Sequence, residues 1–327
     1  MGELSQAYAL ARRVIEAAGK IRLVSHIDLD GIAAAAIIAR WAKSRGVEFS
    51  YRATGVRGVY RAVRDELRRA AAEAAAVVVA DVSLRSRDEA DALTSALKWG
   101  QRLVWLDHHV WDPSVRTVLE EAGALILVDR ERVTASIACL IAQCGRDEVS
   151  RIIEEVARAD DSCSNDPYGL AERWRLVLRV LAPRNASRVF EAFVSGTLWP
   201  QWAEKVYAEN AASYYGELRE KTRIHKYSFD GLEIQVATVP PKASACDVER
   251  LFAGVIEADV IVILYPSGMS IRTMRKGLRA DCIASKMGGG GHATVAGAPR
   301  PSLTLGPAHI ARMIHYAAVK CLNEGEP

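Results

Sequence analysis

The sequence predicts an α/β protein of two domains, the first of which is a doubly wound parallel sheet. Three observations support this prediction. The chain has 327 residues, which is enough for two separate cores. In its first part, short apolar runs alternate with segments of helical period. Several of these runs end in aspartate or histidine, and open α/β sheets keep their ligands at the carboxyl ends of strands.

The composition is that of an ordinary globular protein, with 50% hydrophobic and 25% charged residues and a net charge of +3. The N-terminus lacks the layout of a signal peptide, and no apolar run reaches the roughly 18–20 residues that span a membrane. The six cysteines are scattered without a C-x-x-C pair, which favours buried, reduced thiols over a zinc ribbon. We therefore expect a cytoplasmic protein without membrane contact.

The elements of the first domain follow from hydrophobic periodicity. Strands are expected at residues 21–25, 47–51, 76–80, 102–106 and 124–128. Helices are expected at residues 4–19, 31–45, 58–73 and 86–98. The helix over 31–45 is almost entirely apolar, so it should be buried against the sheet. Gly46 ends this helix.

The helix over residues 58–73 is strongly basic. Its arginines, with one just before it, are Arg57, Arg61, Arg64, Arg68 and Arg69. We interpret them as a solvated face in preference to a nucleic-acid surface.

The second half of the chain predicts a helical segment and then a second α/β pattern. Helices dominate from 134 to 195, and a polar helix over 200–224 is interpreted as a connector. The later strands are expected at 225–229, 232–238, 259–265 and 269–274, with helices at 246–257 and 306–322. This pattern divides the chain into a domain over 1–197, a connector over 198–224 and a smaller α/β domain over 225–327.

Metal-ligating side chains cluster at the predicted strand ends and at one helix end. They are His26, Asp28, Asp30, Asp81, Asp107, His108, His109, Asp160 and Asp161. Because the strand ends converge on one edge of a doubly wound sheet, these residues should become neighbours. Four or more carboxylates would repel one another unless divalent cations neutralise them. Carboxylates with imidazoles suit Mn²⁺ or Mg²⁺ better than a structural zinc. We therefore expect a two-metal site that hydrolyses a phosphorus ester or anhydride.

A second motif is the run Gly288, Gly289, Gly290, Gly291, followed by His292. Consecutive glycines let backbone amides approach an anion, and His292 can donate to a phosphate oxygen. For glycine runs in general, a mobile loop beside a chance histidine is the commoner outcome. No Gly-Lys-Ser/Thr follows, so this is not a P-loop. Arg272, in a predicted strand upstream, could project towards the same pocket.

These motifs resemble those of the DHH phosphoesterase superfamily. The segments SHIDLDG at 25–31, Asp81, DHH at 107–109 and the acid pair 160–161 are similar to its four motifs, and GGGGH at 288–292 is similar to the signature of its DHHA1 domain. The resemblance extends from about residue 20 to about residue 320. It implies a DHH domain with a helical extension and a smaller DHHA1-like domain, with the active site between them.

The resemblance also implies roles for individual residues. His26, Asp28 and Asp81 would hold one Mn²⁺, with Mg²⁺ as the alternative ion. The second ion would be held by Asp30, Asp81, His108 and either Asp160 or Asp161, so that Asp81 bridges the two. Asp107 would orient His108, and His109 would face the scissile phosphate. Arg272, His292 and the glycine amides would bind the phosphate or terminal nucleotide of the substrate.

The predicted function is that of a manganese-dependent phosphodiesterase acting on single-stranded DNA or RNA ends or short oligonucleotides. RecJ-like exonucleases and nanoRNases are the branches of the family that this implies. The alternatives are a small-molecule phosphatase or a cyclic-dinucleotide phosphodiesterase, and then a non-catalytic replication scaffold. Replication or repair proteins and a second copy of the chain are the further partners considered.

Overall fold

The computed structural model describes residues 2–324, except for 99, 101 and 182–184. The chain forms two compact units, Met1–Tyr207 and Ala208–Pro327. The boundary lies within helix α10 (Gln201–Lys221), inside the predicted connector. Residues 182–184 of the predicted helical segment and 325–327 of the predicted second domain lie outside the described residues.

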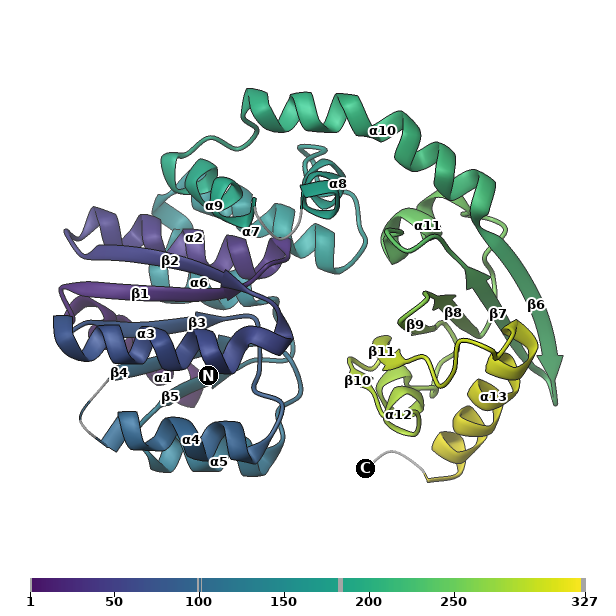
Figure 1. The fold of residues 1–327 in the computed structure, drawn as a ribbon, viewed down its shortest axis with the longest axis horizontal. Helices are drawn as coiled ribbons and strands as arrows, with labels where there is room; N and C mark the ends of the chain where they lie inside the picture. Colours follow the sequence, from purple (N-terminus) through teal and green to yellow (C-terminus); the bar gives the residue numbers. More distant parts are fainter. Residues whose placement is uncertain (1, 99, 101, 182–184, 325–327) are drawn as a thin grey trace. The chain divides into compact units, whose positions relative to one another are not determined.

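The first unit contains a five-stranded sheet in the order β2-β1-β3-β4-β5, in which every neighbouring pair is parallel (Figure 1). The strands are β1 (Lys20–His26), β2 (Glu48–Thr54), β3 (Ala76–Ala80), β4 (Arg102–Asp107) and β5 (Leu125–Val128). The chain reverses its direction of winding at β1, where β2 lies on one side and β3 on the other. This arrangement confirms the predicted doubly wound parallel sheet.

Two hydrophobic cores lie on the two faces of this sheet, because successive strand residues point to opposite sides. Leu23 and Val78 belong to one core, whereas Val24 and Val77 belong to the other. The helices over the first core are α1 (Gly2–Glu16), α2 (Leu29–Ser44), α6 (Thr134–Ala142), α7 (Glu148–Asp161), α8 (Ala171–Leu181) and α9 (Ala186–Ser195). Those over the second are α3 (Val59–Glu73), α4 (Arg87–Lys98) and α5 (Pro113–Glu121).

Helix α5 was not among the predicted elements, although its start carries a local signal. Asp112 accepts a hydrogen bond from the backbone N–H of Ser114 (2.8 Å), and Pro113 occupies the first helical position. Among the described helices of both units, none has the length and apolar character needed to cross a bilayer.

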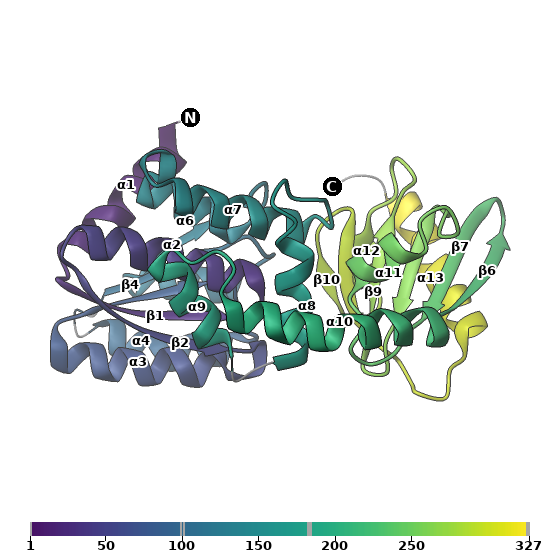
Figure 2. The same ribbon diagram turned by 90° about the horizontal axis from the view of Figure 1, so that it is seen from above.

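The second unit contains a mixed six-stranded sheet in the order β10-β11-β9-β8-β7-β6 (Figure 1). In Figure 2, the labelled strands β10, β9, β7 and β6 follow one another in this order. Its strands are β6 (Arg223–Phe229), β7 (Leu232–Thr238), β8 (Val260–Leu264), β9 (Gly268–Thr273), β10 (Gly290–Gly291) and β11 (Val295–Pro299). Its further helices are α11 (Ala245–Leu251), α12 (Ala280–Ser285) and α13 (Pro307–Glu324). The short elements α12, β10 and β11 were not predicted, and α11 ends earlier than expected.

Two glycines of the 288–291 run are required by strand packing. A Cβ atom on Gly289 would lie 2.0 Å from the carbonyl oxygen of Gly297, and one on Gly291 would lie 2.6 Å from Cα of Ala296. Gly291 also has φ +150, a conformation that residues with a side chain rarely adopt. The run is therefore partly an edge strand pressed against β11, so the expectation of a loop is wrong for Gly290 and Gly291.

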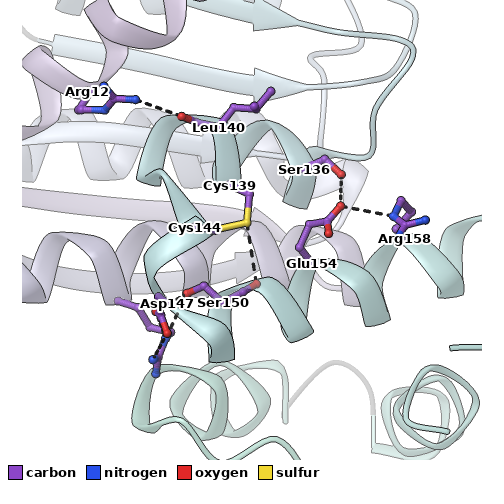
Figure 3. Close-up of a disulfide and its surroundings, with 10 residues drawn as sticks. Arg12, Ser136, Cys139, Leu140, Cys144, Asp147, Ser150, Glu154 and Arg158 are labelled. Carbon is purple, nitrogen blue, oxygen red and sulfur yellow. Dashed lines mark hydrogen bonds and ion pairs between the residues drawn. A yellow bond between two sulfur atoms is a disulfide. The ribbon is translucent and has the colours of Figure 1, made fainter. Parts of the chain in front are cut away.

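The expectation of reduced thiols is wrong, because none of the cysteines among the described residues is free. Cys139 and Cys144 form a disulfide across a Cα–Cα distance of 5.0 Å, and Cys282 and Cys321 form another across 6.0 Å. Figure 3 shows the first bridge between the end of α6 and the segment before α7. A left-handed residue, Gln143, turns the chain back after α6 and brings Cys144 beside Cys139. Neither spacing is a C-x-x-C pair, so the sequence pattern did not indicate the bridges.

Candidate metal centre

The centre begins where β1 passes into α2. His26 is the last residue of β1, and Asp28 caps α2 by accepting a hydrogen bond from the backbone N–H of Gly31 (3.1 Å). Asp30 lies in the first turn of α2 and is buried. The tight turn between strand and helix places these three ligands at the carboxyl edge of the sheet.

His26, Asp28 and Asp81 form one group of potential metal ligands. The Nδ1 atom of His26 lies 2.6 Å from Oδ2 of Asp28 and 3.9 Å from Oδ2 of Asp81. Asp81 follows β3 directly and is buried. Its backbone has φ 64, a strained conformation for a residue with a side chain. Such strain is typical of a residue that is held in place for a functional reason.

Asp81, His108 and His109 form a second group, so Asp81 belongs to both. The Nε2 atom of His108 lies 3.4 Å from Oδ1 of Asp81 and 3.8 Å from Oδ2 of Asp30. The Nδ1 atom of His109 lies 3.9 Å from Oδ1 of Asp81. Ligands from β1, α2, β3 and β4 thus meet around the single carboxylate of Asp81.

The carboxylates of this cluster repel one another. Burial, together with the charges of Asp28 and Asp30, raises the pKa of Asp81 well above its ordinary value. Burial and the same kind of repulsion raise the pKa of Asp30 to about 7. Burial alone would also raise the pKa of Asp28, but His26 lowers it below its ordinary value. The site is therefore short of positive charge.

Asp107 supports His109 from inside the protein. Its Oδ1 lies 2.7 Å from Nδ1 of His109 and accepts the backbone N–H of His108 (2.8 Å), while Oδ2 accepts the indole N–H of Trp111 (2.8 Å). These hydrogen bonds outweigh burial and lower the pKa of Asp107. Burial disfavours the charged form of His109, but Asp107 raises its pKa to about 9. The resemblance assigned Asp107 to His108, whereas the structure places its carboxylate on the ring of His109.

Sequence reasoning missed a support that comes from α6. The backbone N–H groups of Thr134 and Ala135 each donate to Asp30 at 2.8 Å, and the Thr134 hydroxyl donates to Asp81 at 3.0 Å. Thr134 begins α6, where unpaired backbone N–H groups favour an anion. The sequence signal was a threonine at a helix start, which is too common to single out.

The two acids at the end of α7 differ in their surroundings. Asp160 accepts a hydrogen bond from Nε of Arg175 at 2.6 Å, and both side chains are largely buried. Burial raises the pKa of Asp160 to about 6, although Arg175 opposes this shift. Asp161 is exposed, and its negative charge contributes to the raised pKa of Asp30. Both acids therefore interact electrostatically with the cluster.

The remaining predicted site residues belong to the second unit. Arg272 lies on β9, is buried, and forms an ion pair with Glu249 of α11. Its register partner on β11 is Val295. The backbone N–H of His292 donates to the carbonyl of Val295 (2.7 Å) directly after β10. Arg272 and His292 thus lie on adjoining segments of one sheet.

The donor set of the centre fits a hard divalent cation. Imidazole nitrogens and carboxylate oxygens surround Asp81, and the two ligand groups contain no cysteine. This chemistry suits Mn²⁺ or Mg²⁺, and a cation would relieve the repulsion that raises the pKa values of Asp30 and Asp81.

Comparison with known proteins supports the fold. No protein-family model and no curated protein matches the chain. RecJ from Thermus thermophilus in complex with Mn²⁺ matches with a TM-score of 0.61 and 16% identity, over 98% of this chain and 55% of that one. The chain thus spans about half the length of that RecJ.

Two further solved structures match over nearly their whole length. The DHH domain of a member of the s1p family of ribosomal proteins has a TM-score of 0.61 and 15% identity, over 100% of this chain and 93% of that one. An exonuclease RecJ bound to manganese has a TM-score of 0.55 and 14% identity, over 96% and 94%. The chain therefore has the fold of the DHH superfamily, as its motifs predicted.

Proposed function

We propose that this protein is a manganese-dependent phosphodiesterase that hydrolyses single-stranded nucleic acid ends or short oligonucleotides. One observation carries the proposal: two groups of potential metal ligands share the buried, strained Asp81. RecJ proteins of the same fold are described as exonucleases or as complexes with Mn²⁺, which supports the choice of reaction and ion.

The residues that would hold the ions are those of the two groups together with Asp30, except for His109, which would face the phosphate. His26, Asp28 and Asp81 would bind one ion. Asp30, Asp81 and His108 would bind the other, with Asp160 or Asp161 completing its ligands. When bound, the ions would supply charge neutralisation at the phosphate and would activate a water molecule for attack.

The protein groups around the ions hold ligands and protons in place. Thr134 orients the carboxylates of Asp30 and Asp81 through its backbone and hydroxyl groups. Asp107 accepts the Nδ1 proton of His109 and raises the pKa of this imidazole, which favours its protonated form. The Nε2 proton would then be donated to an oxygen of the scissile phosphate.

In the second unit, Arg272, His292 and the amides of Gly288–Gly291 would bind the phosphate or terminal nucleotide of the substrate. The arginine is already oriented by Glu249, so a phosphate would compete with this carboxylate for the guanidinium. Gly289 and Gly291 are also needed for the contact with β11, so substitutions there would affect both the sheet and the binding.

A time course of hydrolysis with Mn²⁺ tests the proposal. DNA and RNA single strands labelled at either end would be compared with a dinucleotide, a cyclic dinucleotide and phosphoadenosine phosphate. An Asp28→Ala, Asp81→Ala double variant is the blank. A ladder from one end of the long strands, absent in the blank, is the expected result. Turnover of small substrates alone would favour the small-molecule alternatives, and no turnover with Mn²⁺ bound would favour the scaffold.

A further inference from the structure

Three arginines of α3, together with one just before the helix, form a row that we call the α3 arginine row. The row consists of Arg57, Arg61, Arg64 and Arg68, at spacings of four, three and four residues. Because residues three and four apart are neighbours on a helix, Arg61, Arg64 and Arg68 follow one another over about 10 Å of α3. Arg57 precedes them in a short 3-10 helix over Val56–Gly58. The opposite face of α3, which includes Val63 and Leu67, is buried against the sheet.

The acids of α3 are paired with Arg64 of this row and with basic residues outside it. Asp65 contacts Arg52 of β2 as well as Arg64. Two further acids, Glu66 and Glu73, pair with Arg22, and Arg69 also pairs with Glu66. Within the described residues, Arg57, Arg61 and Arg68 form no ion pair, and all three are exposed. Their charges are therefore directed at solvent, unlike those of an ordinary salt-bridged helix surface.

A groove lies beside this row, between α3 and α4. Tyr60, Arg64 and Arg68 line one wall, and the guanidinium of Arg64 lies over the ring of Tyr60 at 5.6 Å from its centroid. The other wall is made of side chains of α4, namely Ala92, Leu93, Ser95 and Ala96. The groove encloses 340 Å³, which is enough for a sugar or a base.

The row begins at the edge of the sheet that carries the metal ligands. Thr54, the last residue of β2, is the register partner of His26, and Arg57 follows only three residues later. Because α3 then runs back along the sheet, the row leads away from the ligand cluster within the same unit. A single-stranded nucleic acid whose end is at the ligand cluster could continue along this row.

We propose that the α3 arginine row, with Tyr60, binds the backbone of a single-stranded nucleic acid whose end is held at the metal centre. The inference rests on the proposed function and adds that the substrates are strands several nucleotides long. Guanidinium groups suit bidentate contact with phosphates, and an aromatic ring beside them offers a stacking surface for a base. This replaces the interpretation of the basic helix as a solvated face.

Binding of a fluorescent 20-nucleotide strand at several salt concentrations tests the proposal. The row variant is Arg57→Gln, Arg61→Gln, Arg68→Gln, which disrupts no ion pair among the described residues. A matched control is Arg13→Gln, Arg146→Gln, Arg151→Gln, which removes three exposed charges elsewhere on the first unit. Both variants are measured in an Asp81→Asn background to prevent hydrolysis. Their turnover of a dinucleotide is measured with Asp81 intact.

The row variant should lose about ten-fold or more in affinity for the 20-mer, and its slope of log affinity against log salt should fall by about 2, since each single-strand phosphate contact contributes about 0.7. The control should keep its slope, and both variants should turn over the dinucleotide like the parent protein. An unchanged slope in the row variant, or an equal loss in the control, would overturn the inference. Absence of turnover in the parent protein would instead reject the proposed function, because strand binding is measured separately.

Discussion

Gly31 at the start of α2 lies directly against His26 at the end of β1. A Cβ atom at position 31 would lie 2.8 Å from the carbonyl oxygen of His26 and 2.9 Å from its Cβ atom. Because the carbonyl oxygen of His26 belongs to the backbone, it cannot be displaced without a cost in free energy. The close approach is what allows a strand-end histidine and the two aspartates of the following turn to share one site.

Gly31→Ala should therefore weaken Mn²⁺ binding by at least about ten-fold, because it displaces His26 from the other ligands. Titration calorimetry with Mn²⁺ measures the effect. Gly216→Ala is the matched control, since this glycine is within a helix and its Cβ position is open. The control should keep its Mn²⁺ affinity and gain about 0.5–1 kcal/mol of stability. Equal Mn²⁺ affinity in the two variants would contradict the geometric argument.

Mn²⁺ should stabilise the protein against unfolding, because it neutralises the carboxylates around Asp81. At a concentration 100 times its dissociation constant, the free energy of unfolding should rise by about 2.7 kcal/mol, and a chelator should reverse this. In Asp81→Asn the increase should disappear, whereas Asp88→Asn, an exposed acid of α4, should retain it. Thermal unfolding with and without Mn²⁺ gives the answer. A full increase in Asp81→Asn would remove Asp81 from the ligand set.

Thr134→Val should lower the affinity for Mn²⁺ by about ten-fold or more, since the Asp81 carboxylate loses the hydroxyl that orients it. The backbone N–H groups that donate to Asp30 are unaffected by this substitution. Only Asp81 therefore loses a hydrogen bond. Thr134→Ser keeps the hydroxyl and should restore most of the affinity. If the serine variant binds Mn²⁺ as weakly as the valine variant, the hydroxyl is not the orienting group.

The Cys282–Cys321 and Cys139–Cys144 disulfides should contribute unequally to stability. Cys282 and Cys321 are 39 residues apart, whereas Cys139 and Cys144 are only 5 apart. The Cys282–Cys321 bridge therefore restricts the unfolded chain more. Loop-closure entropy predicts a stabilisation of about 4 kcal/mol from the Cys282–Cys321 bridge and about 2 kcal/mol from the Cys139–Cys144 bridge. Denaturant unfolding of Cys282→Ser and Cys139→Ser measures the free energy of unfolding that each bridge contributes. Cys321→Ser and Cys144→Ser are the comparison variants for the partner cysteines. A larger loss from Cys139→Ser would contradict the order.

Acid should weaken the contact between α2 and the start of α7. Burial raises the pKa of Asp147, but hydrogen bonds from Arg40 (2.9 Å) and Ser150 (2.7 Å) outweigh it, so the pKa is below its ordinary value. A lowered carboxyl pKa gives stability that is present above about pH 4 and is lost as the pH falls through the folded-state value. Figure 3 shows this contact beside the Cys139–Cys144 bridge.

Asp147→Asn should therefore cost about 1 kcal/mol at pH 7, since the pair is partly exposed, and the difference from the parent protein should shrink below pH 4. Urea unfolding at pH 7 and pH 3 measures both values. A difference that does not change with pH would show that the ion pair makes no contribution of its own.

Most of the first unit could be predicted from the sequence because its signals are local. A parallel strand buried on both faces must be continuously apolar, as in Val77–Val79, and the residue that follows such a strand must lie at the ligand edge of the sheet. His26, Asp28, Asp81 and His108 could therefore be selected without coordinates. Their grouping around Asp81 required the parallel register, which the order of strands and helices already implied.

Other features were decided only by tertiary packing. Thr134 reaches Asp30 from 104 residues away, and Cys282 meets Cys321 because α12 packs against α13. Gly289 is required because β11, a strand with Gly297 at its centre and Pro299 at its end, lies against it. Within the part of the chain that the structure describes, Arg57, Arg61 and Arg68 form no ion pair, and this became apparent only once the partners of Asp65 and Glu66 were known. Such contacts join segments whose own composition carries no trace of the partner, so only the folded chain determines them.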